Sequence, residues 1–274
     1  MNAPESIDGR SLRGAAIGVV PVCHDDLEAP AGCAALRDLR GATLLVRSVG
    51  ALLGSGVVGE IVVAVPPVLV PLVEELLRGA ALPPPGGSAV RVHAVRENGF
   101  GHRVRAGLRL ADPPADRPVV VHDPLFPLAS AGLVREVVEA LAAHGDSGDD
   151  GEGRCVVAVP IRPVTDTLKW VDEDDVVLGT ADRDRFRMVY SPQAYWPAGL
   201  ASTLDRAGDE LLRAVGADVL PRLIQAGGGH LLPVMAPGEV FRVSTTEDLI
   251  LADAMLHVGA GGSGQRDAQS HPHR

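Results

Sequence analysis

The sequence contains few aromatic residues and few cysteines, and its charge is strongly acidic. Aromatic residues make up 3% of the 274 residues and hydrophobic residues 46%, so the aliphatic side chains of Val, Leu, Ile and Ala must fill the core. The formal net charge is −10, which excludes the clustered Lys and Arg surface of a general nucleic-acid-binding protein. We therefore expect no nucleic-acid partner and a core of the kind common in α/β proteins.

The few cysteines, the lack of long apolar runs and the lack of common catalytic motifs exclude several classes of protein. The three cysteines (Cys23, Cys33 and Cys155) form no disulfide framework, which favours a reducing, cytoplasmic compartment. We expect no membrane partner, because no uncharged apolar run reaches the roughly 18 residues of a membrane span and no signal-peptide core is present. The G-x-S-x-G, H-E-x-x-H and G-x-x-x-x-G-K-[ST] patterns are also missing, so hydrolase, zinc-protease and P-loop interpretations lack support.

Short apolar runs alternate with amphipathic segments along the chain. Nearly continuous apolar character is typical of strands buried on both faces of a parallel sheet. Ser130, and either Thr245 or Thr246, are placed as helix N-caps. The alternation predicts a doubly wound, mostly parallel α/β sheet of Rossmann-like type. We expect strands at 15–22, 60–67, 90–95, 118–123 and 155–161, and helices at 43–55, 67–79, 102–111, 130–145 and 245–257.

The domain organisation follows from composition. A single α/β domain is expected over residues 14–257. Residues 1–13 are polar and residues 258–274 are rich in Gly, Ser and His, so we expect both ends to be disordered. Residues 163–190 alternate in character and carry many turn residues, which predicts an extended β-hairpin arm.

Several polar residues stand just after expected strands, where open α/β sheets bind their ligands. Asp123 is placed to hold Mg²⁺ or a ribose hydroxyl, or to cap the turn that begins at Pro124. Thr167 and Lys169 offer a hydroxyl and an ammonium group to a phosphate, or form an ordinary polar turn. These alternatives stay open on the residues alone.

Two further motifs carry weaker signals. Arg183, Arg185 and Arg187 have alternate spacing, so on a strand they would share one face that either binds an anion or is solvated. Gly99 and Gly101 precede an expected helix, but the third glycine of a dinucleotide fingerprint is missing. A Rossmann oxidoreductase is therefore poorly supported.

The segment CHDDLEAPAGCAAL (23–36) follows the first strand. A phosphate-binding loop at this place needs glycines, exposed N–H groups and a basic residue, whereas this one contains three carboxylates, including Asp25 and Asp26. Cys23 and His24 with these aspartates could bind a metal ion, but C-x₉-C with one His matches no tight zinc pattern. The competing interpretation is that the cysteines are small buried hydrophobic residues.

The order of these segments resembles the 2-C-methyl-D-erythritol 4-phosphate cytidylyltransferases of the non-mevalonate isoprenoid pathway. The resemblance covers about residues 15–257 and implies a nucleotidyltransferase fold that transfers CMP from CTP to a sugar-alcohol phosphate, with Mg²⁺ and release of pyrophosphate. It also implies a homodimer in which each arm helps to build the partner's site. The motifs that carry it are VHD (121–123), PVTDTLK followed by VD (163–172), ADR (181–183), SPQ (191–193) and TEDL (246–249).

The resemblance assigns roles to individual positions. Asp123 matches an Asp at the nucleotide and metal end, and Thr167 matches a Thr that contacts the substrate. Arg183 matches the Arg that positions the substrate phosphate. Arg242 stands where the family has a Lys that contacts the same phosphate, which keeps the charge but changes the donor geometry.

The nucleotide end departs from the family pattern. The glycine-rich loop and its Arg are absent, and the position of its Lys falls on Ala34, so no catalytic residue is matched. A second family Arg falls on Phe126, and the Arg–Ser pattern after the third strand falls on Phe100 and Arg103. Basic residues at 102, 103 and 105 could supply replacement charge, and the carboxylates near the first strand could bind a second metal ion.

Three functions therefore remain open from the sequence. The first is a cytidylyltransferase acting on 2-C-methyl-D-erythritol 4-phosphate or a related polyol phosphate. The second is an impaired or inactive family member that binds a phosphate ligand or acts as a regulatory dimer, because the Gly-rich loop and its cations are absent. The third is a metal-dependent protein that uses the Cys, His and Asp residues at 23–26.

Overall fold

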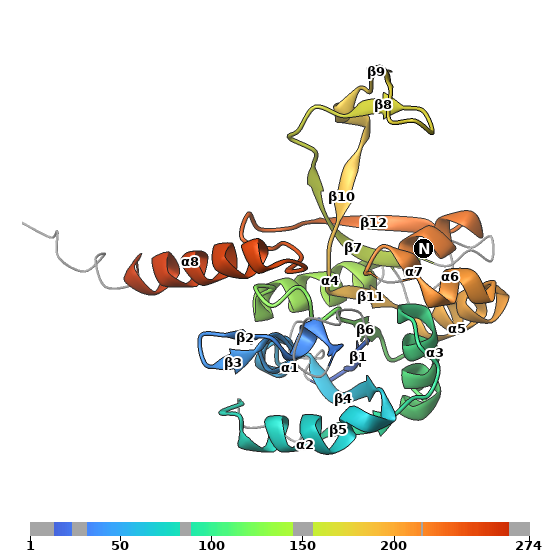
Figure 1. Cartoon of the computed structure of the whole chain (residues 1–274). Helices are drawn as coiled ribbons and strands as arrows, with labels where there is room; N and C mark the ends of the chain where they lie inside the picture. Colours follow the sequence, from blue (N-terminus) through green and yellow to red (C-terminus); the bar gives the residue numbers. More distant parts are fainter. Residues whose placement is uncertain (1–13, 24–31, 83–88, 145–155, 215, 263–274) are drawn as a thin grey trace, which may run out of the picture.

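The computed structural model describes residues 14–23, 32–82, 89–144, 156–214 and 216–262, with side chains as far as residue 257. An eight-stranded sheet forms its centre in the order β10-β7-β11-β6-β1-β4-β5, with β12 also paired to β7 (Figure 1). Its strands are β1 Ala16–Pro21, β4 Val58–Val65, β5 Ala89–Ala94, β6 Val119–Val121, β7 Val156–Pro163, β10 Arg187–Val189, β11 Gln193–Tyr195 and β12 His230–Met235.

The parallel core of the sheet confirms the predicted α/β class. Strand β1 pairs in parallel with β4 on one side and with β6 on the other, and β4 pairs in parallel with β5. Strand β11 lies antiparallel between β6 and β7, so the sheet is mixed at this end. Because the strand order changes direction at β1, the carboxyl ends of β1 and β6 form the edge where a ligand is expected.

Helices cover both faces of the sheet, since the strands are apolar on both sides. Val20 of β1 packs with α1 and α4, whereas its neighbour Val19 packs with α3 and α5. The predicted N-caps are found: Ser130 Oγ accepts the Leu133 N–H at 3.1 Å. The helices are α1 Leu44–Gly54, α2 Val70–Gly79, α3 Phe100–Ala111, α4 Ala131–His144, α5 Pro197–Arg206, α6 Asp209–Arg213, α7 Val219–Ala226 and α8 Thr246–Gly262.

Shorter elements connect these helices and strands. In the described residues, 3-10 helices include Ala34–Leu36, Pro67–Leu69 and Arg183–Arg185, and a short hairpin joins β2 Asp38–Leu39 to β3 Ala42–Thr43. The backbone of α8 continues to Gly262, beyond the predicted helix end at 257. In the described parts of the chain, none of the helices has the length and apolar character needed to cross a membrane.

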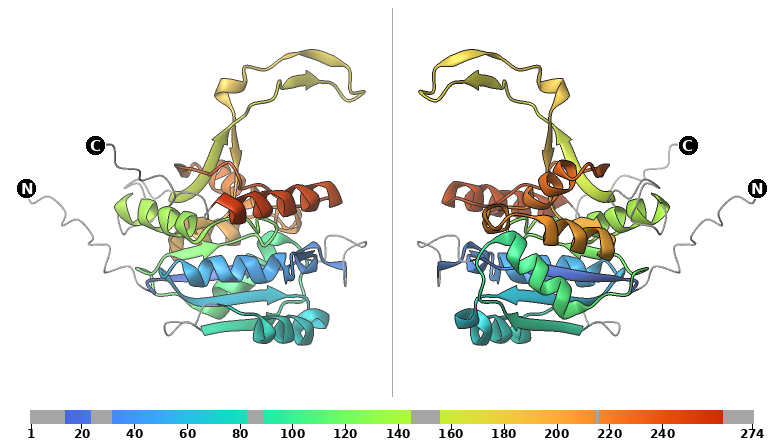
Figure 2. Two further views of the ribbon diagram at one scale, coloured as in Figure 1. Left: turned by 90° about the vertical axis from the view of Figure 1, so that its left-hand side faces the viewer. Right: turned by 90° about the vertical axis from the view of Figure 1, so that its right-hand side faces the viewer.

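The arm predicted at 163–190 projects away from the sheet as a long hairpin (Figure 2). Its outer part is the antiparallel pair β8 Lys169–Val171 and β9 Val177–Thr180, and β10 returns along the end of β7. Arg183, Arg185 and Arg187 do not share one strand face: the first two lie in a 3-10 turn, because the Asp182 side chain accepts the Asp184 N–H and caps that turn.

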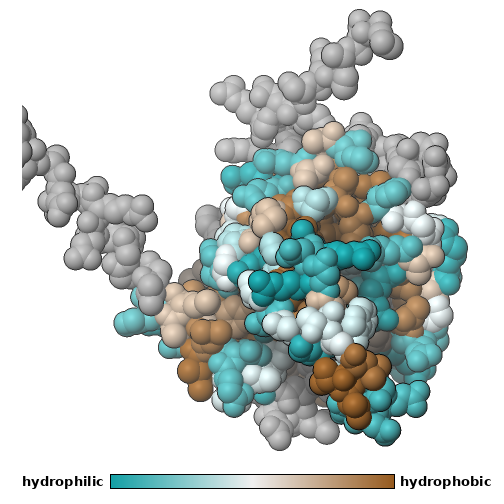
Figure 3. Space-filling model, turned by 90° about the horizontal axis from the view of Figure 1, so that it is seen from above, coloured by the Kyte–Doolittle hydropathy of each residue, from teal (hydrophilic) through white to brown (hydrophobic). Residues whose placement is uncertain are grey.

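Apolar side chains are exposed on the arm. Trp170 and Phe186 pack edge to face with ring centroids 6.3 Å apart, yet Trp170 is still 58% exposed. Leu178 is 66% exposed on the neighbouring strand. Seen from the side of the arm, hydrophobic and hydrophilic residues both reach the molecular surface (Figure 3).

Candidate functional site

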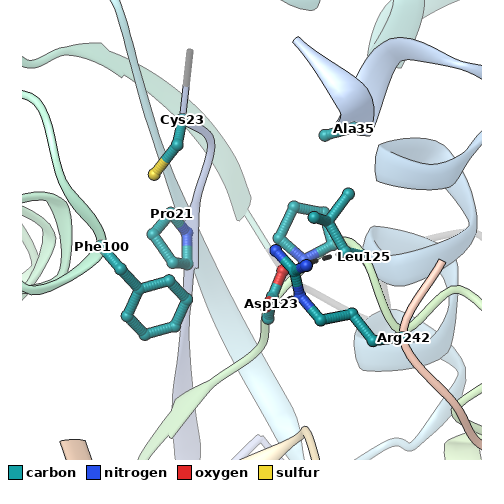
Figure 4. A pocket seen from close by; sticks show the side chains of 8 residues that line it. Pro21, Cys23, Ala35, Phe100, Asp123, Leu125 and Arg242 are labelled. Carbon is teal, nitrogen blue, oxygen red and sulfur yellow. Dashed lines mark hydrogen bonds and ion pairs between the residues drawn. The ribbon is translucent and has the colours of Figure 1, made fainter. Parts of the chain in front are cut away.

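A small pocket lies at the carboxyl ends of β1 and β6. It leaves about 10 Å³ for the centre of a water-sized sphere, which is room for about one water molecule. Most of its lining is apolar, and its two charged side chains, Asp123 and Arg242, lie next to each other (Figure 4). The lining residues are Pro21, Cys23, Ala35, Phe100, Asp123, Pro124, Leu125 and Arg242.

Asp123 is held in place by the chain around it. It is buried two residues after β6, and its Oδ1 accepts the Leu125 N–H at 3.0 Å, which is the turn cap considered from the sequence. Its own N–H donates to Ser191 Oγ at 2.9 Å, so a segment at the base of the arm fixes its backbone. The cap leaves Oδ2 directed toward Arg242, so a structural role and a ligand role are compatible.

His122 supports this arrangement from inside the core. Its Nδ1 lies 2.9 Å from Ser191 Oγ, and the side chain is fully buried. Burial lowers the pKa of His122 to about 3, so the imidazole is neutral at physiological pH. The charge next to the pocket therefore comes from Asp123 and not from this histidine.

Arg242 approaches Asp123 from the segment before α8. Its Nε lies 3.7 Å from Asp123 Oδ2, and its Nη1 donates to Ser244 Oγ at 2.7 Å. The side chain is one-third exposed, so part of the guanidinium remains accessible. The structure thus brings together two predicted site residues that lie far apart in the sequence.

The two positions at which the resemblance places family cations hold buried apolar side chains. Ala34 lies in the 3-10 helix that follows the loop after β1, and it is 2% exposed. Phe126 packs edge to face on Tyr190, with ring centroids 6.0 Å apart, inside a small apolar cluster. Neither position can present a cation to the pocket.

The basic residues at the start of α3 are all engaged elsewhere. His102 Nε2 lies 2.9 Å from Asp209 Oδ1, and Arg105 Nη2 lies 3.0 Å from His102 Nδ1. Arg103 is 2% exposed, and burial lowers the pKa of its guanidinium even though Cys23 opposes that change. None of the three lines the Asp123 pocket, so no replacement cation from this helix reaches it.

The glycines at 99 and 101 have a packing role. A Cβ at Gly99, where φ is +113°, would stand 2.4 Å from Arg213 Cα, and one at Gly101 would stand 2.8 Å from Leu212 Cδ2. Both glycines therefore let α3 approach α6 closely. This contact explains the incomplete glycine motif without a dinucleotide.

The predicted residues of the arm lie away from this pocket within one chain. Lys169 Nζ donates to Thr180 Oγ1 at 2.7 Å across the hairpin. Arg183 donates to the carbonyl oxygen of Thr165, and Thr167 is exposed between these two contacts. The arm points outward (Figure 1), and none of these side chains lines the pocket of its own chain.

The donor set fits a magnesium ion that is shared with phosphates. The described residues contain no group of three or more His, Cys, Asp or Glu side chains that could hold a metal ion by themselves. Mg²⁺ in nucleotide enzymes is commonly held by one or two carboxylates and by substrate phosphates, and Asp123 offers one such carboxylate.

Asp25 and Asp26, considered for a second ion, lie outside the described residues. Cys23 and Cys33 are buried, as expected for small hydrophobic residues.

Some contributors were not assigned from the sequence. Ser191 and His122 support Asp123, and both belong to motifs, SPQ and VHD, that the sequence had singled out only as family signatures. Phe100 was considered as a replaced family Arg, and it now forms a wall of the pocket. The SPQ and VHD motifs were visible in the sequence, but only the fold shows that they lie next to each other.

Comparison with known proteins gives a consistent result. The family model described as 2-C-methyl-D-erythritol 4-phosphate cytidylyltransferase matches residues 29–258. A protein of that name from Rhodococcus jostii (strain RHA1) is 35% identical over 223 residues, covering 81% of this chain and 86% of its own. One from Saccharopolyspora erythraea is 34% identical over 248 residues, covering 88% and 98%. The crystal structure of the enzyme of the same name from Thermus thermophilus has a TM-score of 0.60 and 27% identity, covering 88% of this chain and 98% of its own.

Proposed function

Since the chain belongs to the 2-C-methyl-D-erythritol 4-phosphate cytidylyltransferase family, we propose that it transfers CMP from CTP to 2-C-methyl-D-erythritol 4-phosphate or a closely related polyol phosphate. The observation that carries the proposal is the match over residues 29–258, together with Asp123 and Arg242 facing each other at the ligand edge of the sheet. The reaction would serve isoprenoid precursor synthesis by the non-mevalonate pathway.

The chemistry needs few protein groups. A phosphate oxygen of the polyol attacks the α-phosphorus of CTP, the bond from the α-phosphorus to the bridging oxygen breaks, and pyrophosphate leaves with that oxygen. The main requirement is for positively charged groups at fixed positions, because negative charge accumulates on the phosphoryl oxygens during the reaction. Arg242 would bind the polyol phosphate, and Asp123 would hold Mg²⁺. When bound, this ion would neutralise charge on the phosphates of CTP.

The arm enters the proposal through a second copy of the chain. Thr167, Lys169 and Arg183 carry hydroxyl, ammonium and guanidinium groups suited to a phosphate, and they lie far from the pocket of their own chain. A homodimer that exchanges arms would deliver them to the partner's Asp123 and Arg242. The exposed apolar side chains of the arm support such an interface.

One observation favours a second candidate function. Buried Ala34 and Phe126 stand at the positions where the resemblance implies cations, and each missing transition-state donor costs roughly 10²–10³ in rate. A phosphate-binding dimer with little or no transferase activity would keep Arg242 and the arm. It would bind the polyol phosphate but not CTP.

The deciding experiment is a pyrophosphate-release assay on the full chain with CTP, Mg²⁺ and 2-C-methyl-D-erythritol 4-phosphate. We expect turnover that needs all three components and that Asp123→Asn abolishes. The matched control is Asp205→Asn, because Asp205 pairs with Arg109 on the outer surface. Absence of turnover at high protein concentration, with calorimetric binding of the polyol phosphate alone, would replace the transferase by the binding function.

A further inference from the structure

The Arg103 guanidinium joins the segments that follow β1 and β5. Its Nη1 donates to the carbonyl oxygen of Val95 at 3.0 Å, and its Nη2 donates to Asn98 Oδ1 at 3.2 Å. It also hydrogen-bonds the thiol of Cys23, two residues after β1. Because β4 lies between β1 and β5, the guanidinium spans the carboxyl ends of three neighbouring strands. Open α/β sheets bind their ligands at this edge.

The burial of Arg103 is costly for a side chain that only packs. Its Nε has no hydrogen-bond partner among the described residues, although the side chain is 2% exposed. A buried guanidinium with an unsatisfied donor costs stability, and an apolar residue would fill the same space without that cost. The charged side chain therefore calls for an explanation beyond packing.

The space that remains next to Phe100, in the same helix turn as Arg103, is small. The pocket at Asp123 and Arg242 has room for about one water molecule, whereas nucleotide-sized ligands occupy pockets of about 300–1,000 Å³. Phe100 from the same helix turn closes one side of that pocket (Figure 4). Phe100 and Arg103, in the first turn of α3, thus lie at the ligand edge between the ends of β1 and β5.

We propose that Arg103 is a specificity-determining residue, which occupies one half of the ligand edge and leaves the Asp123–Arg242 half for a small phosphorylated ligand. A nucleoside triphosphate has to displace the guanidinium and break its hydrogen bonds to Val95, Asn98 and Cys23. The apparent affinity for CTP is then reduced by the fraction of molecules in which Arg103 is displaced. The inference rests on the proposed function only for the choice of CTP and polyol phosphate as the two ligands.

Calorimetry on the full chain tests this assignment without using turnover. Titrations of CTP with Mg²⁺, and separately of 2-C-methyl-D-erythritol 4-phosphate, are made with the wild type, Arg103→Ala and Arg103→Gln. We expect the Kd for CTP to fall about tenfold or more in both variants, because the obstacle is removed. The Kd for the polyol phosphate should stay within about twofold, because that ligand uses the other half of the edge.

Arg105→Ala is the matched control, because Arg105 lies on the same helix but bonds His102. Its CTP affinity should equal that of the wild type. Unchanged or weaker CTP binding in a folded Arg103 variant overturns the inference, whatever the turnover. Failure of both Arg103 variants to fold would also overturn it, by making Arg103 a core residue. Higher CTP affinity without turnover would instead contradict the proposed transferase and leave the inference standing.

Discussion

At the residue scale, the pocket contains one carboxylate and one guanidinium in contact. The Asp123 carboxylate accepts the Leu125 N–H and pairs with Arg242, and Ser191 Oγ accepts the Asp123 backbone N–H, so both the side chain and the backbone of Asp123 are held. Arg242 also donates to Ser244 and is partly exposed. An incoming phosphate can therefore recruit Arg242 more easily than it can move Asp123.

Replacement of Arg242 tests its proposed contact with the substrate phosphate. Arg242→Met should weaken calorimetric binding of 2-C-methyl-D-erythritol 4-phosphate by about 10–100-fold, since a hydrogen bond to a charged group contributes about 1.5–3 kcal/mol. Arg242→Lys should lose less, because it keeps the charge. Arg109→Met, at the surface pair with Asp205, should leave binding unchanged. Equal affinity in Arg242→Met and wild type would remove Arg242 from the site.

At the element scale, the contacts of α3 and α8 place the residues of the pocket. Gly99 and Gly101 let the start of helix α3 pack closely against α6. The first turn of α3 supplies Phe100 and Arg103. Helix α8 begins with a reciprocal cap: Thr245 Oγ1 accepts the Asp248 N–H at 3.1 Å, and Asp248 Oδ2 accepts the Thr245 N–H at 2.9 Å. This cap holds the segment that carries Arg242.

The helix contact at Gly99 should tolerate no side chain. Gly99→Ala places a Cβ within 2.5 Å of both Arg213 Cα and Leu212 O and forces a positive φ on a non-glycine residue. We expect a loss of about 2–4 kcal/mol in the free energy of unfolding, measured by urea denaturation. Gly79→Ala is the matched control, because nothing lies within 4 Å of its added Cβ. Similar stability of the two variants would contradict the close helix contact.

The cap of α8 gives a pH-dependent prediction. Burial raises the pKa of Asp248, but hydrogen bonds from Ser244 and Thr245, with nearby Arg242, lower it overall below its ordinary value of 3.8. The ionised carboxylate therefore stabilises the fold above pH 3.8, and this contribution is lost as the pH falls through the lowered pKa.

Urea unfolding at pH 7 should show Asp248→Asn less stable than wild type by about 1 kcal/mol. The difference should shrink as the pH falls below 3.8, where the native carboxylate also becomes neutral. Asp253→Asn is the control on the same helix, because its contact with Arg40 is an exposed pair at 3.6 Å. A difference that stays constant down to pH 3 would show that the carboxylate charge is not involved.

At the scale of the whole molecule, the arm is the feature that a single chain does not explain. It extends from the sheet with apolar side chains exposed, and it carries Thr167, Lys169 and Arg183 away from Asp123 (Figure 2). Exchange of arms in a homodimer would bury the exposed apolar side chains and bring Thr167, Lys169 and Arg183 to the pocket of the other copy. The architecture is the same for the transferase and for the binding-only function.

Mixed dimers test the exchange directly. Asp123→Asn and Thr167→Ala should each be inactive alone in the pyrophosphate-release assay, because each lacks one half of the site. Unfolding and refolding the two together should restore about a quarter of the wild-type activity, since half of the dimers are mixed and each has one intact site. Asp123→Asn mixed with itself is the control. No recovery, from mixtures shown to be dimeric, would mean that each arm does not serve the partner's pocket.

Much of the fold was predictable from the sequence, because buried parallel strands leave nearly continuous apolar runs, as in β1 and β4. The caps Ser130 and Thr245 were predictable because their hydroxyls stand just before apolar-periodic segments. Strand β11 was not expected: it has three residues, too few for a period, and its place between β6 and β7 depends on tertiary pairing. Helices α5, α6 and α7 were likewise not expected.

The site was only partly predictable. Asp123 was found from its place after a strand, and Arg242 from the resemblance alone. The sequence could not show that Arg103 does not line this pocket, because the direction of a side chain in a first helical turn depends on its neighbours. The same reason applies to Phe126, whose ring is drawn into a cluster with Tyr190.

The connection between the arm and the pocket limits where insertions and deletions can occur in this chain during evolution. Tyr190, against which Phe126 packs, and Ser191, which holds Asp123, follow directly after β10. Insertions or deletions in the outer hairpin, from Lys169 to Thr180, would therefore change the reach of the arm without disturbing the carboxylate. A change of even one residue between Val189 and Gln193 would shift the anchor itself. Evolved variants of this chain should accordingly differ in length at the tip of the arm, from Lys169 to Thr180. They should not differ in length at its base, between Val189 and Gln193.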